Sequence, residues 1–385
     1  MIPNPGARRV RVVLPILLCA FGVFGLFWGT FAVLLADLSG ALDLSPGPLG
    51  VTLFVGAAAS ILAMALLGRT SDRLGRRVFL VLSGAVMGLG IAALAFAGGY
   101  AALLGALVVI YAASGLYDVG INAAAVDLEK AAGRRFMAVL HAAFSAGGAA
   151  GALAAGALLS AGVDYRMVYL ALLPPLGAVV LTVAATRFPP PGEPAEDGTR
   201  QAGLYRSLPL LLVAVIATLA LLSEGEMEHW SGIYLRRILG LSALLGGSGV
   251  AVFYGSMAVG RLGAAFVIGR FGNRRTLQGA GLLAAGGMAL ALATRASLLV
   301  VAGFLVVGLA LSAVVPIAFS AAGDLAPGYA GAAISVVTTL GYGGFLLGPV
   351  TVGGLAEVLG LRIAMGVIVV SGLMIFALSL RLKVP

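Results

Sequence analysis

Apolar runs of about 20 residues follow one another along the whole chain. A helix rises about 1.5 Å per residue, so each run can cross the roughly 30 Å hydrocarbon core of a bilayer. The composition agrees, because 61% of the 385 residues are hydrophobic and only 10% are charged, whereas a soluble domain carries about a quarter charged residues. The sequence therefore predicts an all-α membrane protein that crosses the bilayer many times.

We expect twelve transmembrane helices. The first half, residues 1–187, is predicted to hold helices at 11–36, 47–68, 78–98, 101–127, 136–160 and 166–187. Residues 188–206 are rich in proline, glycine and charge, which predicts a linker that has no reason to pack. The second half, residues 207–385, is predicted to hold helices at 207–235, 243–269, 275–294, 297–322, 329–356 and 361–381.

A repeat relates the two halves at an offset of 196 or 197 residues. The matched pairs are Arg73 and Arg270, Gly75 and Gly272, Asp127 and Asp324, Gly147-Gly148 and Gly343-Gly344, and Arg166 and Arg362. This spacing indicates two parallel six-helix halves, a relation that in secondary transporters places the solute site between the halves near the bilayer midplane. The copies are unequal, because Gly269 and Asn273 stand where Asp72 and Arg76 stand in the first half.

The 24 lysines and arginines predict the topology. With the N-terminus inside, 18 fall in cytoplasmic segments, five fall on the outer side and Arg261 lies within a helix. Positive charge gathers on the cytoplasmic side of membrane proteins, so we expect both termini in the cytoplasm and the chain in the cell (inner) membrane. The net charge of +9 has the same cause and does not indicate nucleic-acid binding, because the arginines lie in short loops rather than on one face of a domain.

Several chemistries find no support in the sequence. The one cysteine, Cys19, lies in an apolar run, and His141 and His229 alone do not make a metal site. There is no G-x-x-x-x-G-K-[ST] loop for a nucleotide. We therefore expect no enzyme activity, no cofactor and no metal. The expected partners are a small-molecule substrate, protons and the lipid bilayer, and the protein is expected to be a monomer.

The densest run of charge lies between two apolar segments. It extends from Gly68 to Arg77, with Gly75 to permit a bend and arginines that cannot enter lipid. The pattern G-x-x-x-D-R-x-G-R-R resembles the signature loop between helices 2 and 3 of the major facilitator superfamily of transporters. The resemblance implies a loop that stabilises the outward-facing state; a plain positive anchor is the alternative. The implied gating residues are Gly68, Asp72, Arg73, Gly75, Arg76 and Arg77.

Two carboxylates are candidates for proton coupling. Asp118 lies about two-thirds along its predicted helix, close to the bilayer midplane, with Asn122 one turn later, and Glu224 lies just past the middle of the seventh helix. An ionisable group at bilayer depth costs about 2.5–3.5 kcal/mol, so each needs a reason to be there. A carboxyl group there can take up and release a proton as access alternates, and Asn122 can orient Asp118 or bind a substrate hydroxyl. A structural polar pair is the alternative.

Other polar residues have more than one interpretation each. Glu226 and Glu228 are expected on a solvated vestibule face, although a role in the site stays open. His141 is expected to relay a proton, contact the solute or only pack. Arg261 is expected to pair with a carboxylate or to snorkel rather than to touch substrate.

Aromatic side chains supply the remaining candidates. Trp28 and Tyr342 lie deep enough to stack on a sugar face or to line an apolar drug pocket. Trp230 and Tyr234 stand near a helix end, where an interfacial belt is the alternative. The candidate substrate-binding residues are Asn122, Trp28, His141, Tyr342, Glu228 and Trp230.

Several stretches resemble the sugar-permease branch that includes fucose permeases. They are Asp118-x-x-x-Asn122, His141-x-x-Phe144-Ser145-x-Gly147, Glu224-Gly225 with Trp230, Gly260-Arg261, Gly341-Tyr342 and Gly348-Pro349. The resemblance implies a proton-coupled secondary transporter of a small polar solute such as a sugar, with Asp118 at the position of a coupling carboxylate. A second acid that fucose permeases carry in helix 1 has no match here. A proton-coupled exporter of amphipathic drugs or metabolites is the alternative, and a receptor or scaffold without transport is a third.

Overall fold

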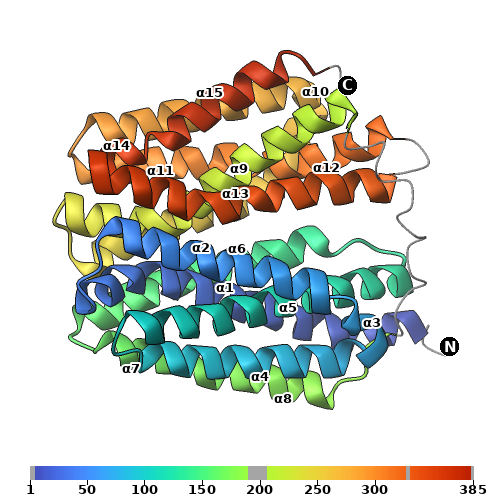
Figure 1. The fold of residues 1–385 in the computed structure, drawn as a ribbon. Coiled ribbons are helices and arrows are strands. Elements are labelled where there is room, and N and C mark those ends of the chain that lie inside the picture. The colour runs from blue at the N-terminus through green and yellow to red at the C-terminus, as the bar shows by residue number, and fades with distance from the viewer. Residues whose placement is uncertain (1–4, 190–205, 327–329, 383–385) are drawn as a thin grey trace. The chain divides into compact units, whose positions relative to one another are not determined.

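The computed structural model describes residues 5–189, 206–326 and 330–382, and every regular element in these ranges is helical. Figure 1 labels most of them. In the first part of the chain they are α1 (Pro5–Ala41), α2 (Pro46–Leu67), α3 (Thr70–Leu74), α4 (Arg76–Ala95), α5 (Tyr100–Ala132), α6 (Met137–Ser160), α7 (Tyr165–Leu170) and α8 (Leu173–Ala185). In the second part they are α9 (Leu208–Ile233), the π-helical turn η2 (Tyr234–Ile238), α10 (Ala243–Ala293), α11 (Ser297–Leu311), α12 (Val314–Leu325), α13 (Ala330–Leu359), α14 (Leu361–Ala364) and α15 (Val367–Ser379).

The predicted twelve-helix fold is confirmed. Eleven helices of the described chain are long and apolar enough to cross a membrane. One of them, α10, joins the predicted helices at 243–269 and 275–294, and its backbone breaks at Gly272, where φ is 77° and ψ is 164°. The break separates two spans, which brings the number to twelve.

Some predicted helices are interrupted where the sequence pattern gave one continuous run. The sixth consists of α7 and α8, the tenth of α11 and α12, and the twelfth of α14 and α15. Proline follows the first of these breaks at Pro174 and Pro175 and the second at Pro316, where it fits the first turn of a new helix. The predicted linker 188–206 falls almost wholly on residues 190–205, outside the described ranges.

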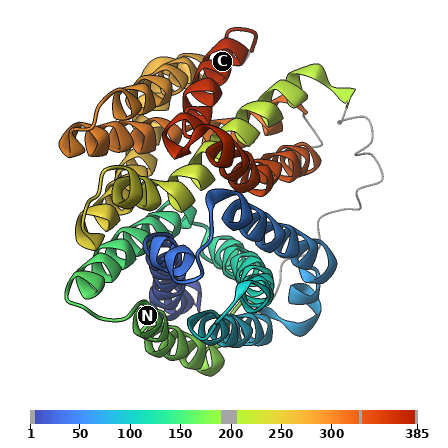
Figure 2. The ribbon, with the colours of Figure 1, turned by 60° about the vertical axis from the view of Figure 1, so that its left-hand side comes forward.

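Contacts divide the chain into two compact units. The first comprises Met1–Leu44 and Thr52–Glu193, and the second comprises Ser45–Val51 and Pro194–Pro385. Within each unit the long helices run side by side, as Figures 1 and 2 show. The first turn of α2 has its contacts in the second unit: the backbone N–H of Gly47 donates to Glu357 Oε2 of α13 at 2.8 Å.

Glycines lie where helices of each unit approach each other closely. In the first unit α1 packs on α6, where a Cβ at Gly25 would collide with the Phe144 carbonyl. In the second unit α9 packs on α13, where a Cβ at Gly344 would collide with the Thr218 carbonyl. Small residues allow helix backbones to approach closely in a membrane, where packing rather than the hydrophobic effect drives association.

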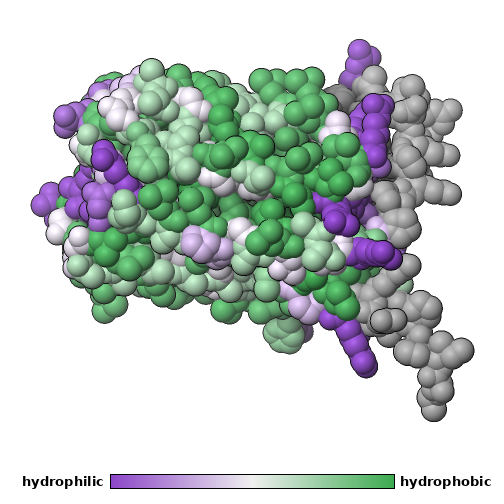
Figure 3. All heavy atoms as spheres, turned by 90° about the horizontal axis from the view of Figure 1, so that it is seen from below, coloured by the Kyte–Doolittle hydropathy of each residue, from purple (hydrophilic) through white to green (hydrophobic). Residues whose placement is uncertain are grey.

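The outer surface matches a lipid environment. On the face drawn in Figure 3, apolar side chains cover the middle and hydrophilic ones gather at the two ends. Large apolar side chains stay exposed on the long helices, among them Leu89 at 69%, Leu181 at 72% and Phe266 at 78%. In a soluble protein such a surface would aggregate, so these helices face lipid.

Candidate functional site

The charged turn of the first unit is organised around one arginine. Arg76 opens α4 and is only 8% exposed. Its Nε donates to Asp127 Oδ2 of α5 at 2.7 Å, and its Nη1 donates to Ser71 Oγ at 2.8 Å and to Asp72 Oδ1 at 2.6 Å. Gly75, with φ of 79° and ψ of 151°, makes the bend that turns Arg76 inward.

The other arginines of this turn behave as predicted for a charged loop. Arg69, Arg73 and Arg77 are exposed. Arg76 differs because it forms an ion pair with Asp127, a pairing that no motif in the sequence indicates. The only hint was that Asp127 recurs as Asp324 in the second half. Hence the turn is more than a solvated anchor: it ties α3, α4 and α5 together.

Asp118 and Asn122 are brought together as the spacing predicted. Both lie on α5 and are half-buried. The Asn122 Nδ2 group donates to Asp118 Oδ1 and to the Asp118 backbone carbonyl, each at 2.9 Å. The amide therefore holds one carboxylate oxygen in place through the helix's own i, i+4 geometry.

An aromatic cluster lines α1 in the same unit. Trp28 makes edge contacts with Phe27, Phe31 and Tyr111, the last with ring centroids 5.0 Å apart. Trp28 itself is half-buried, which leaves part of the indole available to a ligand.

His141 of α6 contacts another aromatic ring of α1. Its ring packs edge-on against Phe21 of α1, with centroids 5.4 Å apart, and the residue is half-buried. The edge contact with Phe21 is of the kind that the packing alternative for this histidine predicts.

In the second unit, a carboxylate and an arginine form an ion pair between two helices. Arg261 Nη2 of α10 donates to Glu224 Oε1 of α9 at 2.8 Å, with the side chains 20% and 10% exposed. Arg261 thus pairs with a carboxylate, one of the two roles foreseen for it. Glu228, one turn along α9, is half-buried and lies near Glu224, Arg261 and the Tyr254 hydroxyl of α10. Arg261 therefore bonds to Glu224 and lies within electrostatic range of Glu228.

Glu226 contradicts the expectation of a solvated vestibule face. Its side chain is 0% exposed, and neither carboxyl oxygen has a hydrogen-bond partner among the described residues. The periodicity of α9 separates Glu226 from Glu224 and Glu228 by about 200°, so it points to the other side of the helix, toward α13. Sequence alone could not show that α13 covers this side of α9.

The remaining candidates of the second unit lie on α9, η2 and α13. His229 Nδ1 is 2.6 Å from the Gly225 carbonyl, and Trp230 and Tyr234 are 0% exposed. Because both aromatic side chains are fully covered, the lipid-facing belt proposed as an alternative for them is wrong. Tyr342 of α13 is half-buried beside Phe345, with ring centroids 6.3 Å apart.

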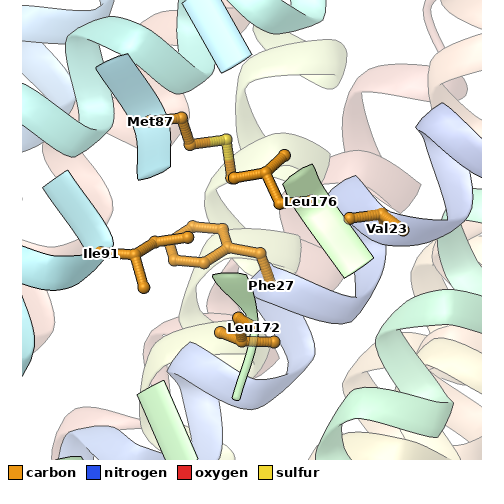
Figure 4. A pocket seen from close by; sticks show the side chains of 6 residues that line it. All are labelled: Val23, Phe27, Met87, Ile91, Leu172 and Leu176. Carbon is orange, nitrogen blue, oxygen red and sulfur yellow. The ribbon is translucent and has the colours of Figure 1, made fainter. Parts of the chain in front are cut away.

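A pocket in the first unit is unsuited to a polar solute. It is lined by Val23, Phe27, Met87, Ile91, Leu172 and Leu176, shown in Figure 4. All six side chains are apolar, so the pocket offers a solute no hydrogen bond from a side chain. Nor do three His, Cys, Asp or Glu side chains of the described residues come together as metal ligands.

Known proteins resemble this chain over nearly its whole length. The sequence model of the Major Facilitator Superfamily matches residues 17–349. An uncharacterised MFS-type transporter of Yersinia pestis is 33% identical over 347 residues, or 90% of each chain. Membrane protein MosC of Rhizobium meliloti is 30% identical over 380 residues, which cover 98% of this chain and 91% of MosC.

Solved structures share the fold. A bacterial homologue of the human lysosomal transporter Spinster, inward-facing and occupied, matches with a TM-score of 0.80 and 18% identity, covering 97% of this chain and 96% of that one. The nucleoside transporter NupG matches with a TM-score of 0.77 and 14% identity, covering 96% of this chain and 97% of that one. At such identities the likeness concerns the fold alone.

Proposed function

Because the chain belongs to the major facilitator superfamily and is a membrane transporter, we propose that it is a proton-coupled secondary transporter of a small polar solute. The observation that carries the proposal is the set of ionisable groups inside apolar spans, namely Asp118 on α5 and the Glu224–Arg261 pair with Glu228. Each such group costs about 2.5–3.5 kcal/mol at the bilayer centre. A passive scaffold has no use for them.

Proton coupling needs a carboxyl group that is neutral in one state and ionised in another. Asp118 meets this need because its hydrogen-bond partner, Asn122, is neutral. The amide nitrogen donates to the ionised carboxylate, and the other oxygen can carry the proton. Glu224 offers a second position, where protonation would release Arg261 to Glu228.

The polar groups near these acids favour a solute with hydroxyl groups. Arg261 is neutralised by Glu224, so no free cation in this cluster of the described chain calls for a phosphate. Trp28 and Tyr342 are half-buried rings of the kind that stack on sugars. With the resemblance to fucose permeases, this supports a sugar as the substrate, bound by Asn122, Trp28, His141, Tyr342 and Glu228. Trp230, the sixth candidate, is fully covered and is left out of this proposed set.

One observation favours a second candidate function. The aromatic cluster on α1, in which Trp28 touches Phe27, Phe31 and Tyr111, would also suit an amphipathic compound. A proton-coupled exporter of such compounds is therefore the alternative. In both cases we propose alternating access by two six-helix halves, 1–187 and 207–385, in a monomer of the inner membrane with both termini in the cytoplasm.

The first experiment identifies the solute. Purified protein is screened by thermal shift against sugars, amino acids, organic acids and lipophilic cations, because a ligand of the folded state raises its apparent stability. We expect a sugar to stabilise the protein. Stabilisation by lipophilic cations alone would replace the sugar hypothesis by the exporter.

The second experiment tests coupling. In proteoliposomes loaded with that solute, Asp118→Asn is expected to abolish accumulation driven by a pH gradient while exchange of solute persists. Asp43→Asn is the matched control, because Asp43 is exposed in a loop and its φ of 48° suits asparagine. Full pH-driven accumulation by Asp118→Asn would remove Asp118 from the mechanism.

A further inference from the structure

Of the three acids on α9, Glu226 is the one that has no hydrogen-bond or ion-pair partner among the described residues. Glu224 pairs with Arg261, and Glu228 lies near Arg261 and Tyr254. Glu226 is fully buried, and both of its oxygens are unbonded among the described residues. A buried carboxylate without a partner is too costly to persist in an apolar environment, and such a group becomes neutral instead.

The side opposite Glu226 is shaped to accept it. Gly348 of α13 lies so close to Glu226 that a Cβ added at Gly348 would be only 2.5 Å from Glu226 Oε1. The next residue, Pro349, removes a backbone hydrogen bond inside α13. A helix turn with one bond missing bends more easily than its neighbours, so the cover over Glu226 is also the deformable part of α13.

Titratable residues are unevenly distributed over the elements packed against α9. Its neighbours α11 and α15 carry no titratable residue at all, α12 carries only Asp324, and α13 carries only Tyr342 and Glu357. On α10, Arg261 pairs with Glu224 and Tyr254 lies near Glu228. The other titratable residues of α10 are Arg270, Arg274 and Arg275, and those of η2 are Tyr234, Arg236 and Arg237. None of these groups hydrogen-bonds to Glu226.

A row of polar atoms leads away from Glu226 along its own helix. Trp230 and Tyr234 follow at successive i+4 positions, and Ser231 is the residue after Trp230. The Trp230 indole nitrogen, the Ser231 hydroxyl and the Tyr234 hydroxyl are all buried without a hydrogen-bond partner in the described chain. The row ends at the π-helical turn η2, and π-turns occur often at functional sites.

We infer that Glu226 holds a proton in this conformation and is a proton-carrying site distinct from the Glu224–Arg261 pair. The hydroxyl groups of Ser231 and Tyr234 can donate to and accept from water that enters here, whereas the Trp230 N–H can only donate. When α13 bends at Pro349 and water reaches the carboxyl group, its O–H bond breaks and the proton passes to a water molecule. The carboxylate that remains takes up a proton from water before it is covered again. The role of this step in coupling rests on the proposed function, but the protonated state does not.

Infrared spectroscopy of the full chain in lipid vesicles at neutral pH tests the inference. A protonated carboxylic acid has a carbonyl stretching band that a carboxylate lacks. We expect Glu226→Gln to remove such a band from the wild-type spectrum. Glu357→Gln is the matched control and should leave the band in place, because Glu357 is exposed and accepts a backbone hydrogen bond.

A second variant guards against loss of folding in the first. Glu226→Asp keeps the carboxyl group and should shift the band rather than remove it. If every protonated-carboxyl band of the wild type persists unchanged in both Glu226 variants, Glu226 is ionised and the inference is wrong. Because no solute is needed, this result is independent of whether the wild type couples solute to protons.

Discussion

The charged turns of the two units have the same backbone and different chemistry. Gly75 and Gly272 are related by the 197-residue offset, and their φ and ψ values are 79° and 151° against 77° and 164°. In the first unit the next residue, Arg76, is buried against Asp127. In the second unit Asn273 stands in that place, and Asp324, the counterpart of Asp127, is exposed. The turn is therefore made by glycine, and the ion pair is a separate addition.

The acids inside the membrane spans also differ between the units, in where their partners lie. In the first unit Asp118 is held by Asn122 on its own helix. In the second unit Glu224 is held by Arg261 on another helix, and Glu226 is held by nothing polar in the described chain. Protonation of Asp118 changes the contacts of one helix, whereas protonation of Glu224 changes a contact between two. We therefore expect protonation to change helix packing more in the second unit than in the first.

The largest expected difference is between the losses of stability caused by Asp127→Ala and by Asp324→Ala. Asp127→Ala leaves the buried guanidinium of Arg76 without its main partner and should destabilise the protein by about 3 to 5 kcal/mol. Asp324→Ala removes an exposed carboxylate and should change stability by no more than about 0.5 kcal/mol. Thermal unfolding of the two variants in the same detergent makes the comparison. Equal losses would mean that the ion pair does not distinguish the turns.

Substitution of the turn glycine should destabilise the two units by similar amounts, although substitution of the charged residues does not. Gly75→Ala and Gly272→Ala each force a side chain into a region of φ and ψ that only glycine tolerates, at about 1 to 3 kcal/mol each. No atom crowds either the Gly75 or the Gly269 position, so Gly269→Ala, within a helix, is the control and should be neutral or stabilising. A large difference between the Gly75 and Gly272 variants in thermal unfolding would break the equivalence of the two turns.

A smaller effect is expected where α13 faces Glu226. Gly348→Ala pushes against the flexible end of the Glu226 side chain and should cost about 1 kcal/mol. Gly343→Ala lies in the same helix with open space around it and serves as the control. If thermal unfolding shows the two variants to be equal, Glu226 does not pack against Gly348 as described.

The smallest effect comes from copying the first turn into the second. The double substitution Gly269→Asp and Asn273→Arg restores the missing charges, but Asp324 is exposed. Exposed pairs contribute up to about 1 kcal/mol, so thermal stability should rise by less than that. A gain of several kcal/mol would show that Asn273→Arg is buried as Arg76 is.

The sequence predicts the helices well because hydropathy is a local property. Helix boundaries agree within a few residues at most ends; α2, for example, is predicted at 47–68 and observed at Pro46–Leu67. It predicts the Asp118–Asn122 contact too, since i, i+4 geometry is fixed by the helix itself. It does not predict that Arg76 meets Asp127, 51 residues away, or that α13 covers Glu226. Those depend on how helices rotate about their axes when they pack.

Proton movement during transport tests the central claim most directly. Wild-type protein is reconstituted with a pH-sensitive dye in the lumen, and the solute found by thermal shift is added outside without an imposed pH gradient. We predict that the solute changes the luminal pH, with acidification for uptake together with a proton and alkalinisation for exchange against one, and that Asp118→Asn abolishes the change. Solute entry into wild-type vesicles at constant luminal pH would contradict proton coupling.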